Sequence, residues 1–222
     1  MITKDTQKIK NLFNEIAIYY DKMNNIISFG THYIIKFLAL RTLNLAPRTM
    51  LLDLCCGTGD NSRLLNKFFP RVKVIGLDFS ANMVKIAKLK NPSSVFMQGD
   101  CTNLPFGENE FDYITISFGL RNIPDKDLAL NQMYRVLKRG GKVMHLDVGN
   151  HNFAFKIFTF LIPIFAKIFR KSLDNYNYLK DSVNEFLEPE ELVKLFETHN
   201  FKHIKTTNYL LGAIASEVFE KM

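Results

Sequence analysis

Two glycines separated by one residue follow a short apolar stretch and could bring the backbone close to a ligand. They are Gly57 and Gly59 in the sequence CGTGD at 56–60, which ends the apolar run that begins at Met50. Glycine permits a tight turn, and the N–H groups at the start of a following helix can bind a carboxylate or phosphate. A dinucleotide site would carry a third glycine, whereas here Asp60 follows. The pattern favours a cofactor with an amino-acid part, although an ordinary strand-to-helix turn would also fit it.

Two carboxylates follow later apolar stretches and could complete such a site. Asp78 lies about 20 residues after Gly57, the spacing at which a carboxylate accepts hydrogen bonds from ribose hydroxyls. It could also cap the next helix, a role that Ser80 could fill instead. Asp100, in the sequence GDC at 99–101, follows the next apolar run, where a side chain can meet an adenine amino group or serve only a turn. Because ligands bind at the carboxyl ends of strands in open α/β sheets, we expect one site here.

Strands and helices must alternate to position these residues. Short apolar runs predict strands at 50–56, 72–77, 95–98, 111–117 and 142–147. Helical spacing predicts helices at 5–23, 32–43, 61–69, 81–90, 127–137 and 189–199, with Gly140-Gly141 stopping the fifth of them. Two final strands, 202–208 and 213–219, should pair antiparallel at the edge of the sheet.

This order predicts an α/β fold of one domain with a doubly wound sheet and helices on both faces. We expect seven strands with one antiparallel edge strand. Within the single domain 1–222 we expect an N-terminal helical cap at 1–46, a cofactor-binding core at 47–149, and an apolar lid segment with the last strands at 150–222.

Composition and charge restrict the possible partners, metal sites and cellular location of the protein. The chain has 222 residues and a net charge of +7, which favours anionic partners without choosing among them. Three cysteines, two of them adjacent, predict neither a secreted disulfide framework nor a structural zinc site, so we expect a reducing cytoplasm and no metal. The polar N-terminus lacks a signal peptide, and the apolar run 157–166 is too short to span a bilayer.

Four segments carry motifs of a known family: YDKMNNIISFGTH at 20–32, LDLCCGTGD at 52–60, ISFGLRNI at 116–123 and MYRVLKRGG at 133–141. They resemble the UbiE/MenG family of quinone C-methyltransferases. The third is the most family-specific, because general methyltransferases lack it, and a looser match follows at 176–183. The resemblance runs over almost the whole chain and implies the class I Rossmann-like fold of enzymes that use S-adenosylmethionine.

The resemblance also implies which residues contact the cofactor. The family's contacts would fall on Thr58, Asp78, Asp100, Cys101 and Ser117, and the first three agree with the patterns above. We include four neighbouring residues of the same motifs in the expected cofactor site: Asp53, Gly57, Gly59 and Phe79.

The implied reaction is methylation of a ring carbon in a membrane-resident polyprenyl quinol, with demethylmenaquinol as the expected acceptor. Arg121 and Asn122, after the fourth strand, are candidates for stabilising a phenolate, and a fixed cation there could lower the quinol pKa. Tyr20 and Asp21 are expected to act from the N-terminal cap. His145 is expected to be a buried strand residue rather than a catalyst.

The segment 153–171 combines phenylalanines with lysines and has two interpretations. It is either a buried lid helix kinked at Pro163 or an amphipathic surface that contacts the bilayer. The second would place a cytoplasmic enzyme at the inner face of the membrane, beside its substrate. A homodimer is left open.

Other functions remain alternatives. The corresponding benzoquinol of ubiquinone biosynthesis, another small-molecule acceptor and a binding protein without activity all fit the same fold. The charge of +7 also suggests a nucleic-acid methyltransferase, but SFGL at 117–120 lacks the Pro-Pro motif with which amino-methylating enzymes hold the target amine, and we expect no nucleic-acid partner.

Overall fold

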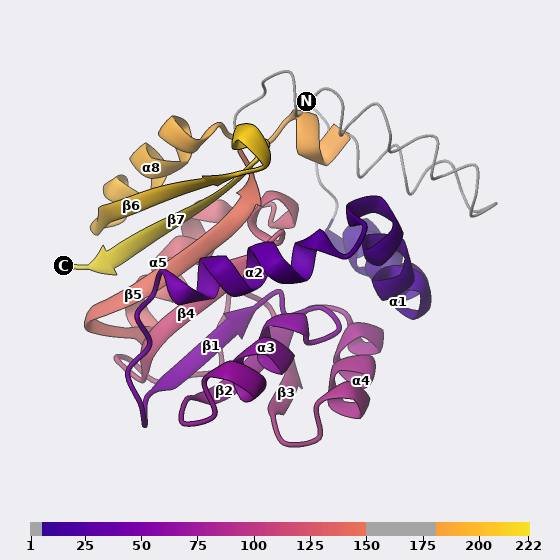
Figure 1. Ribbon diagram of the computed structural model, residues 1–222. Helices are drawn as coiled ribbons and strands as arrows, with labels where there is room; N and C mark the ends of the chain where they lie inside the picture. The colour runs from indigo at the N-terminus through magenta and orange to yellow at the C-terminus, as the bar shows by residue number, and fades with distance from the viewer. Residues whose placement is uncertain (1–5, 150–180) are drawn as a thin grey trace.

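The computed structural model describes residues 6–149 and 181–222, which form a central sheet covered by helices (Figure 1). Its seven strands follow the order β3-β2-β1-β4-β5-β7-β6. Their bounds are β1 Met50–Leu54, β2 Lys73–Asp78, β3 Val95–Gln98, β4 Phe111–Ser117, β5 Leu137–Val148, β6 Phe201–Tyr209 and β7 Ile214–Lys221.

The sheet has the predicted mixed topology. Strands β1 to β5 pair in parallel, and β7 runs antiparallel to both β5 and β6. The predicted seven-stranded fold is therefore confirmed, with β7 as the antiparallel strand and β6 outside it at the edge.

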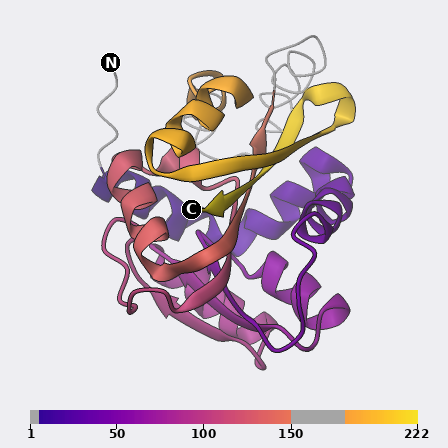
Figure 2. The same cartoon turned by 90° about the vertical axis from the view of Figure 1, so that its left-hand side faces the viewer.

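Helices cover both faces of the sheet (Figure 2). Their bounds are α1 Thr6–Ser28, α2 Thr31–Arg41, α3 Asp60–Phe68, α4 Ala81–Lys90, α5 Lys126–Val136 and α8 Pro189–Thr198, with short 3-10 turns η1 Leu120–Asn122 and η2 Leu210–Gly212. One core cluster joins α2 and α3 to the sheet, and another joins α5 and α8 to the opposite face. None of the described helices is long and apolar enough to cross a membrane.

The central strand β1 shows why the sheet needs both layers. Leu51 packs into the α2–α3 cluster, whereas Leu52 and Leu54 pack into the α5–α8 cluster, and all three are fully buried. Side chains alternate between the faces of a strand, so a continuous apolar run is stable only where both faces are covered.

Most predicted boundaries differ from the structure by one or two residues, and the end of α1 and the start of β5 differ most. Helix α1 continues beyond Met23 to Ser28. The prediction that Gly140-Gly141 stop the fifth helix was wrong: α5 ends at Val136, and β5 begins at once because Leu137 already pairs with Phe111. Both glycines lie inside β5, and Gly140 takes a φ of 71° there.

Candidate cofactor and acceptor site

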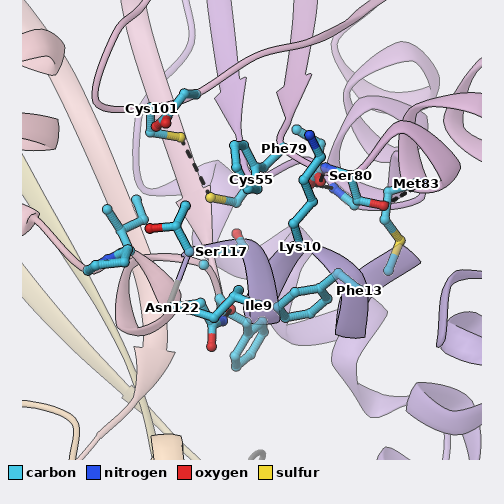
Figure 3. A pocket seen from close by; sticks show the side chains of 18 of the residues that line it. Ile9, Lys10, Phe13, Cys55, Phe79, Ser80, Met83, Cys101, Ser117 and Asn122 are labelled. Carbon is cyan, nitrogen blue, oxygen red and sulfur yellow. Dashed lines mark hydrogen bonds between the residues drawn. The ribbon is translucent and has the colours of Figure 1, made fainter. Parts of the chain in front are cut away.

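A cavity lies where the carboxyl ends of the parallel strands meet helix α1 (Figure 3). The segments after the strands contribute one wall, made of Cys55, Gly57, Asp78, Phe79, Ser80, Asp100, Cys101, Ser117, Phe118, Gly119, Asn122, Ile123 and Pro124. The helices contribute the other, made of Thr6, Ile9, Lys10, Phe13 and Tyr20 from α1 and Met83 from α4.

Asp78 fixes the backbone of the glycine loop, residues 56–60, at the edge of this cavity. The Gly57 N–H donates to Asp78 Oδ2 over 2.8 Å, and the Ser80 N–H donates to Asp78 Oδ1 over 2.9 Å. Burial raises the pKa of Asp78, although these backbone hydrogen bonds act in the opposite direction. The cap of α4 is Ser80, whose hydroxyl accepts from the Met83 N–H. Asp78 therefore organises the loop and lines the cavity, rather than capping the helix.

Asp53 lies behind the cavity instead of lining it. Its Oδ1 accepts from Asn61 Nδ2 over 2.9 Å and from Thr115 Oγ1 over 2.7 Å, and Asn61 Nδ2 also reaches Ser117 Oγ at 3.1 Å. Oδ2 has no hydrogen-bond partner among the described residues. Burial raises the pKa of this carboxyl to about 6. Asp53 thus supports the site from below, through Asn61 and Ser117.

Replacing Asp53 with asparagine is expected to stabilise the unliganded protein at pH 7. Its pKa is 3.8 ordinarily and about 6 when folded, so its stabilising contribution is complete below pH 3.8 and is lost as the pH rises through 6. The variant avoids that loss, which amounts to about 1–3 kcal/mol. Urea denaturation between pH 4 and 7 should show the advantage of the variant growing with pH.

Asp112 provides a control, because its pKa is shifted in the opposite direction to that of Asp53. Although partial burial opposes it, hydrogen bonds from Lys138 and the Met50 N–H lower the pKa of Asp112. Its stabilising contribution is therefore present above its ordinary pKa and is lost toward acid, so Asp112→Asn should be the less stable protein at pH 7. A pH-independent gap between Asp53→Asn and the parent would contradict the prediction.

Two other predicted cofactor contacts also lie outside the cavity lining. The Thr58 hydroxyl donates to Asp21 Oδ1, so it faces α1. Gly59 precedes α3 with a φ of 83°, and a Cβ there would lie 2.6 Å from Asn91 Nδ2. The structure brings the remaining predicted cofactor residues together at the cavity: Gly57, Asp78, Phe79, Asp100, Cys101 and Ser117.

The predicted catalytic residues divide into two groups. Tyr20 and Asn122 line the cavity. Arg121 instead forms a buried ion pair with Asp147 of β5, and Asp21 pairs with Lys90 Nζ at 2.6 Å. Neither Arg121 nor Asp21 is among the residues that line the cavity, and each faces an oppositely charged partner, so the electrostatic role of Arg121 and the cap role of Asp21 stay predictions.

His145 is a buried residue of strand β5, as expected from the sequence. It is 1% exposed, and its Nδ1 lies 2.8 Å from Glu217 Oε2 of β7. The rings of Phe186 and Phe196 pack beside it. His145 is a buried strand residue that joins β5 to β7.

Sequence reasoning placed Tyr20 of the N-terminal cap at the site but missed three other residues of α1. Ile9, Lys10 and Phe13 also line the cavity (Figure 3). The helical spacing of Ile9, Phe13 and Tyr20 was the available signal, since these positions share one helix face.

The cavity has the chemistry of a cationic, amino-acid-bearing nucleoside rather than a dinucleotide. Its lining has two carboxylates, Asp78 and Asp100, and apolar walls. Among the described lining residues the only cationic side chain is that of Lys10, whose Nζ lies 4.8 Å from the Phe79 ring. Carboxylates can accept from hydroxyl and ammonium groups, whereas they would repel a pyrophosphate. The residues present therefore fit S-adenosylmethionine.

Solved structures share this fold over nearly the whole chain. A SAM-dependent methyltransferase of Thermotoga maritima, described as a "possible histamine N-methyltransferase", matches with a TM-score of 0.73 and 20% identity over 96% of this chain and 100% of that one. The [4+2]-cyclase SpnF matches with a TM-score of 0.74 and 13% identity over 97% and 96%. Such likeness shows the fold alone, since one fold supports several reactions.

Fold and site together define a class I S-adenosylmethionine-dependent methyltransferase. The chain belongs to the ubiE/COQ5 methyltransferase family, whose model matches residues 1–221.

Three relatives show how close the match is. The demethylmenaquinone methyltransferase of Staphylococcus carnosus is 41% identical over 221 residues, covering 95% of this chain and 92% of the relative. That of Anoxybacillus flavithermus is 36% identical, covering 97% and 96%. That of Staphylococcus aureus strain JH9 is 39% identical, covering 94% and 91%. The resemblance found in the sequence motifs is confirmed.

Proposed function

We propose that this enzyme methylates a ring carbon of demethylmenaquinol and so forms menaquinol. The observation that carries the proposal is the 36–41% identity, over nearly the whole chain, to relatives named for demethylmenaquinone methylation. The cavity supports it, because an apolar wall with Tyr20 and Asn122 at its lining suits a flat, hydroxylated ring.

The cofactor supplies an electrophilic methyl group bound to a sulfonium. Transfer would join this methyl group to the ring carbon, with the sulfur leaving as a neutral thioether and the proton of the ring carbon passing to solvent. Ionisation of the neighbouring quinol hydroxyl makes that carbon more nucleophilic.

The chain's own residues position and desolvate the two partners. Asp78 and the Gly57 backbone hold the cofactor side, and Ile9 and Phe13 exclude water above it. The Tyr20 hydroxyl and the Asn122 amide can hydrogen-bond a quinol oxygen. Arg121 Cζ lies 5.8 Å from the ring centroid of Phe118, which lines the cavity, and its positive charge favours the phenolate.

The direct test is transfer of tritium from methyl-labelled S-adenosylmethionine to a reduced quinone. Reduced demethylmenaquinone and the corresponding reduced benzoquinone should be offered separately, with the oxidised quinones as controls. Label is expected in the extracted naphthoquinol and not in the oxidised controls. Label only in the benzoquinol would assign the enzyme to ubiquinone biosynthesis instead. Cofactor binding without label in either quinol would reject a quinol as the acceptor.

We also propose that this cytoplasmic enzyme contacts the inner face of the membrane through 153–171, a segment outside the described residues. Two features of the described chain support this. Leu210 and Leu211 of η2 are 52% and 90% exposed. The adjoining Ala213 carbonyl accepts from the N–H of Gly149, the last residue described before that segment, so these leucines lie close in sequence to a contact of Gly149. Flotation with anionic and neutral liposomes tests the proposal, and absence of binding to both would remove it.

A further inference from the structure

Helix α1 forms one wall of the cofactor cavity, although few of its described apolar side chains are fully buried. Ile9 and Ala17 are the buried side chains among those that the structure describes in α1, whereas Ile18 is 76% exposed. Leu12, Phe13 and Ile16 are half-buried, so polar contacts add to partial apolar burial in holding this helix over the cavity.

Two groups of these polar contacts join α1 to α4 and to the glycine loop. Asn14 Oδ1 accepts from the Ser80 hydroxyl over 2.7 Å and from the Asn82 N–H over 3.2 Å, at the start of α4. One to two turns further along α1, Asp21 accepts from the Thr58 hydroxyl and from Lys90 Nζ. Only the second contact involves charged groups, and it reaches the glycine loop itself.

The Lys90 ammonium group joins three separate segments. Its Nζ lies 2.6 Å from Asp21 Oδ2 of α1, 3.2 Å from Thr58 Oγ1 of the glycine loop and 3.2 Å from Asp60 Oδ1 at the start of α3. An ammonium group has three N–H donors, so these three acceptors saturate it. Its side chain is only 22% exposed, and charge-assisted hydrogen bonds are stronger where water is partly excluded.

Asp60 does not depend on Lys90 alone. Lys36 Nζ of α2 lies 3.1 Å from Asp60 Oδ2. Although burial acts to raise it, the two ammonium groups lower the pKa of Asp60 to about 2. Loss of Lys90 would thus leave Asp60 paired, and Asp21 is 30% exposed and can be hydrated. The contact that would disappear is the link between α1 and the glycine loop.

We propose that Lys90 is a positioning residue for the cofactor, acting through Asp21 and Thr58. By holding α1 against the glycine loop, it keeps Ile9, Lys10, Phe13 and Tyr20 in place as the wall over the bound cofactor. Asp21 accordingly acts in this link rather than on the acceptor. The inference rests on the cofactor assignment and is independent of which acceptor is methylated.

The test compares Lys90→Met with Lys88→Met by calorimetric titration with S-adenosylmethionine. Both lysines lie in the last turn of α4, and Lys88 is exposed, so the two variants lose the same charge near the same helix end. Lys90→Met is expected to weaken cofactor binding at least tenfold, while Lys88→Met leaves it within twofold. Lys90→Arg should recover much of the loss, because it restores a cation with several donors.

Two further measurements separate positioning from general destabilisation. Cofactor should protect α1 from limited proteolysis in the parent and in Lys88→Met, and fail to protect it in Lys90→Met at saturating ligand. Asp21→Asn should show the same loss of affinity, and the double variant should be no weaker than either single one. Parent-like affinity and protection in Lys90→Met, or fully additive losses, would overturn the proposal. Failure of quinol methylation would affect none of these readouts.

Discussion

Asp78→Ala is expected to weaken S-adenosylmethionine binding by about 100-fold while leaving the protein folded. The carboxylate holds the N–H groups of Gly57 and Ser80 at 2.8 and 2.9 Å, so its removal frees the glycine loop and removes the acceptor for ribose hydroxyls. Hydrogen bonds to a charged group contribute about 1.5–3 kcal/mol each, and 100-fold corresponds to about 2.8 kcal/mol. Calorimetric titration with the cofactor measures the change.

Asp125→Ala is the matched control for this prediction. Asp125 is also a carboxylate that accepts a backbone N–H, that of Leu128 over 2.8 Å, but it caps α5 and does not line the cavity. Its loss should cost about 1 kcal/mol of stability and leave cofactor affinity unchanged. Equal affinities for Asp78→Ala and Asp125→Ala would show that Asp78 does not bind the cofactor.

Arg121→Ala is expected to lower both stability and turnover, for separable reasons. Asp147 is fully buried, and its Oδ1 is held by Arg121 and by the Val148 N–H at 2.8 Å. Removing the cation leaves an uncompensated buried carboxylate, which costs about 3–5 kcal/mol of folding free energy. Loss of the fixed positive charge near the acceptor should lower kcat about 100-fold while cofactor affinity changes little. Denaturation, titration and methyl-transfer rates measure the three quantities.

The double variant Arg121→Met/Asp147→Asn distinguishes the two roles. It removes both charges at once, and so should recover most of the stability that Arg121→Ala loses. If Arg121 acts on the acceptor, turnover remains low in this variant. Recovery of turnover together with stability would make the ion pair purely structural, and parallel losses of kcat and cofactor affinity in Arg121→Ala would contradict the electrostatic role.

Local sequence patterns were sufficient to predict most of the fold and one side of the cavity. Leu51, Leu52 and Leu54 form a continuous apolar run, which indicates a strand buried on both faces. Once parallel strands are inferred, their carboxyl ends must meet at one edge, so Asp78 and Asp100 could be placed together before any contact was known.

The ion pairs could not be predicted in this way. Periodicity shows which face of an element is buried, but not which partner a charged side chain meets across the fold. Arg121 and Asp147 lie 26 residues apart, and Asp21 and Lys90 lie 69 residues apart. Tyr20 and Asp21 are neighbours in sequence, yet Tyr20 lines the cavity whereas Asp21 pairs with Lys90. Successive residues of a helix point about 100° apart, so the two side chains take different directions.

The position of β7 between β5 and β6 has a consequence for how the chain folds. In the described sheet β6 pairs with β7 alone, although the ribosome makes β6 first. Only residues 210–213 separate β6 from β7, so this antiparallel pair can form as a local hairpin before β7 docks on β5. The pairing of His145 with Glu217 closes a loop of 72 residues, and such long-range closure is entropically costly and slow. We expect β6 and β7 to acquire protection from hydrogen exchange together during refolding, as one hairpin that docks late on β5.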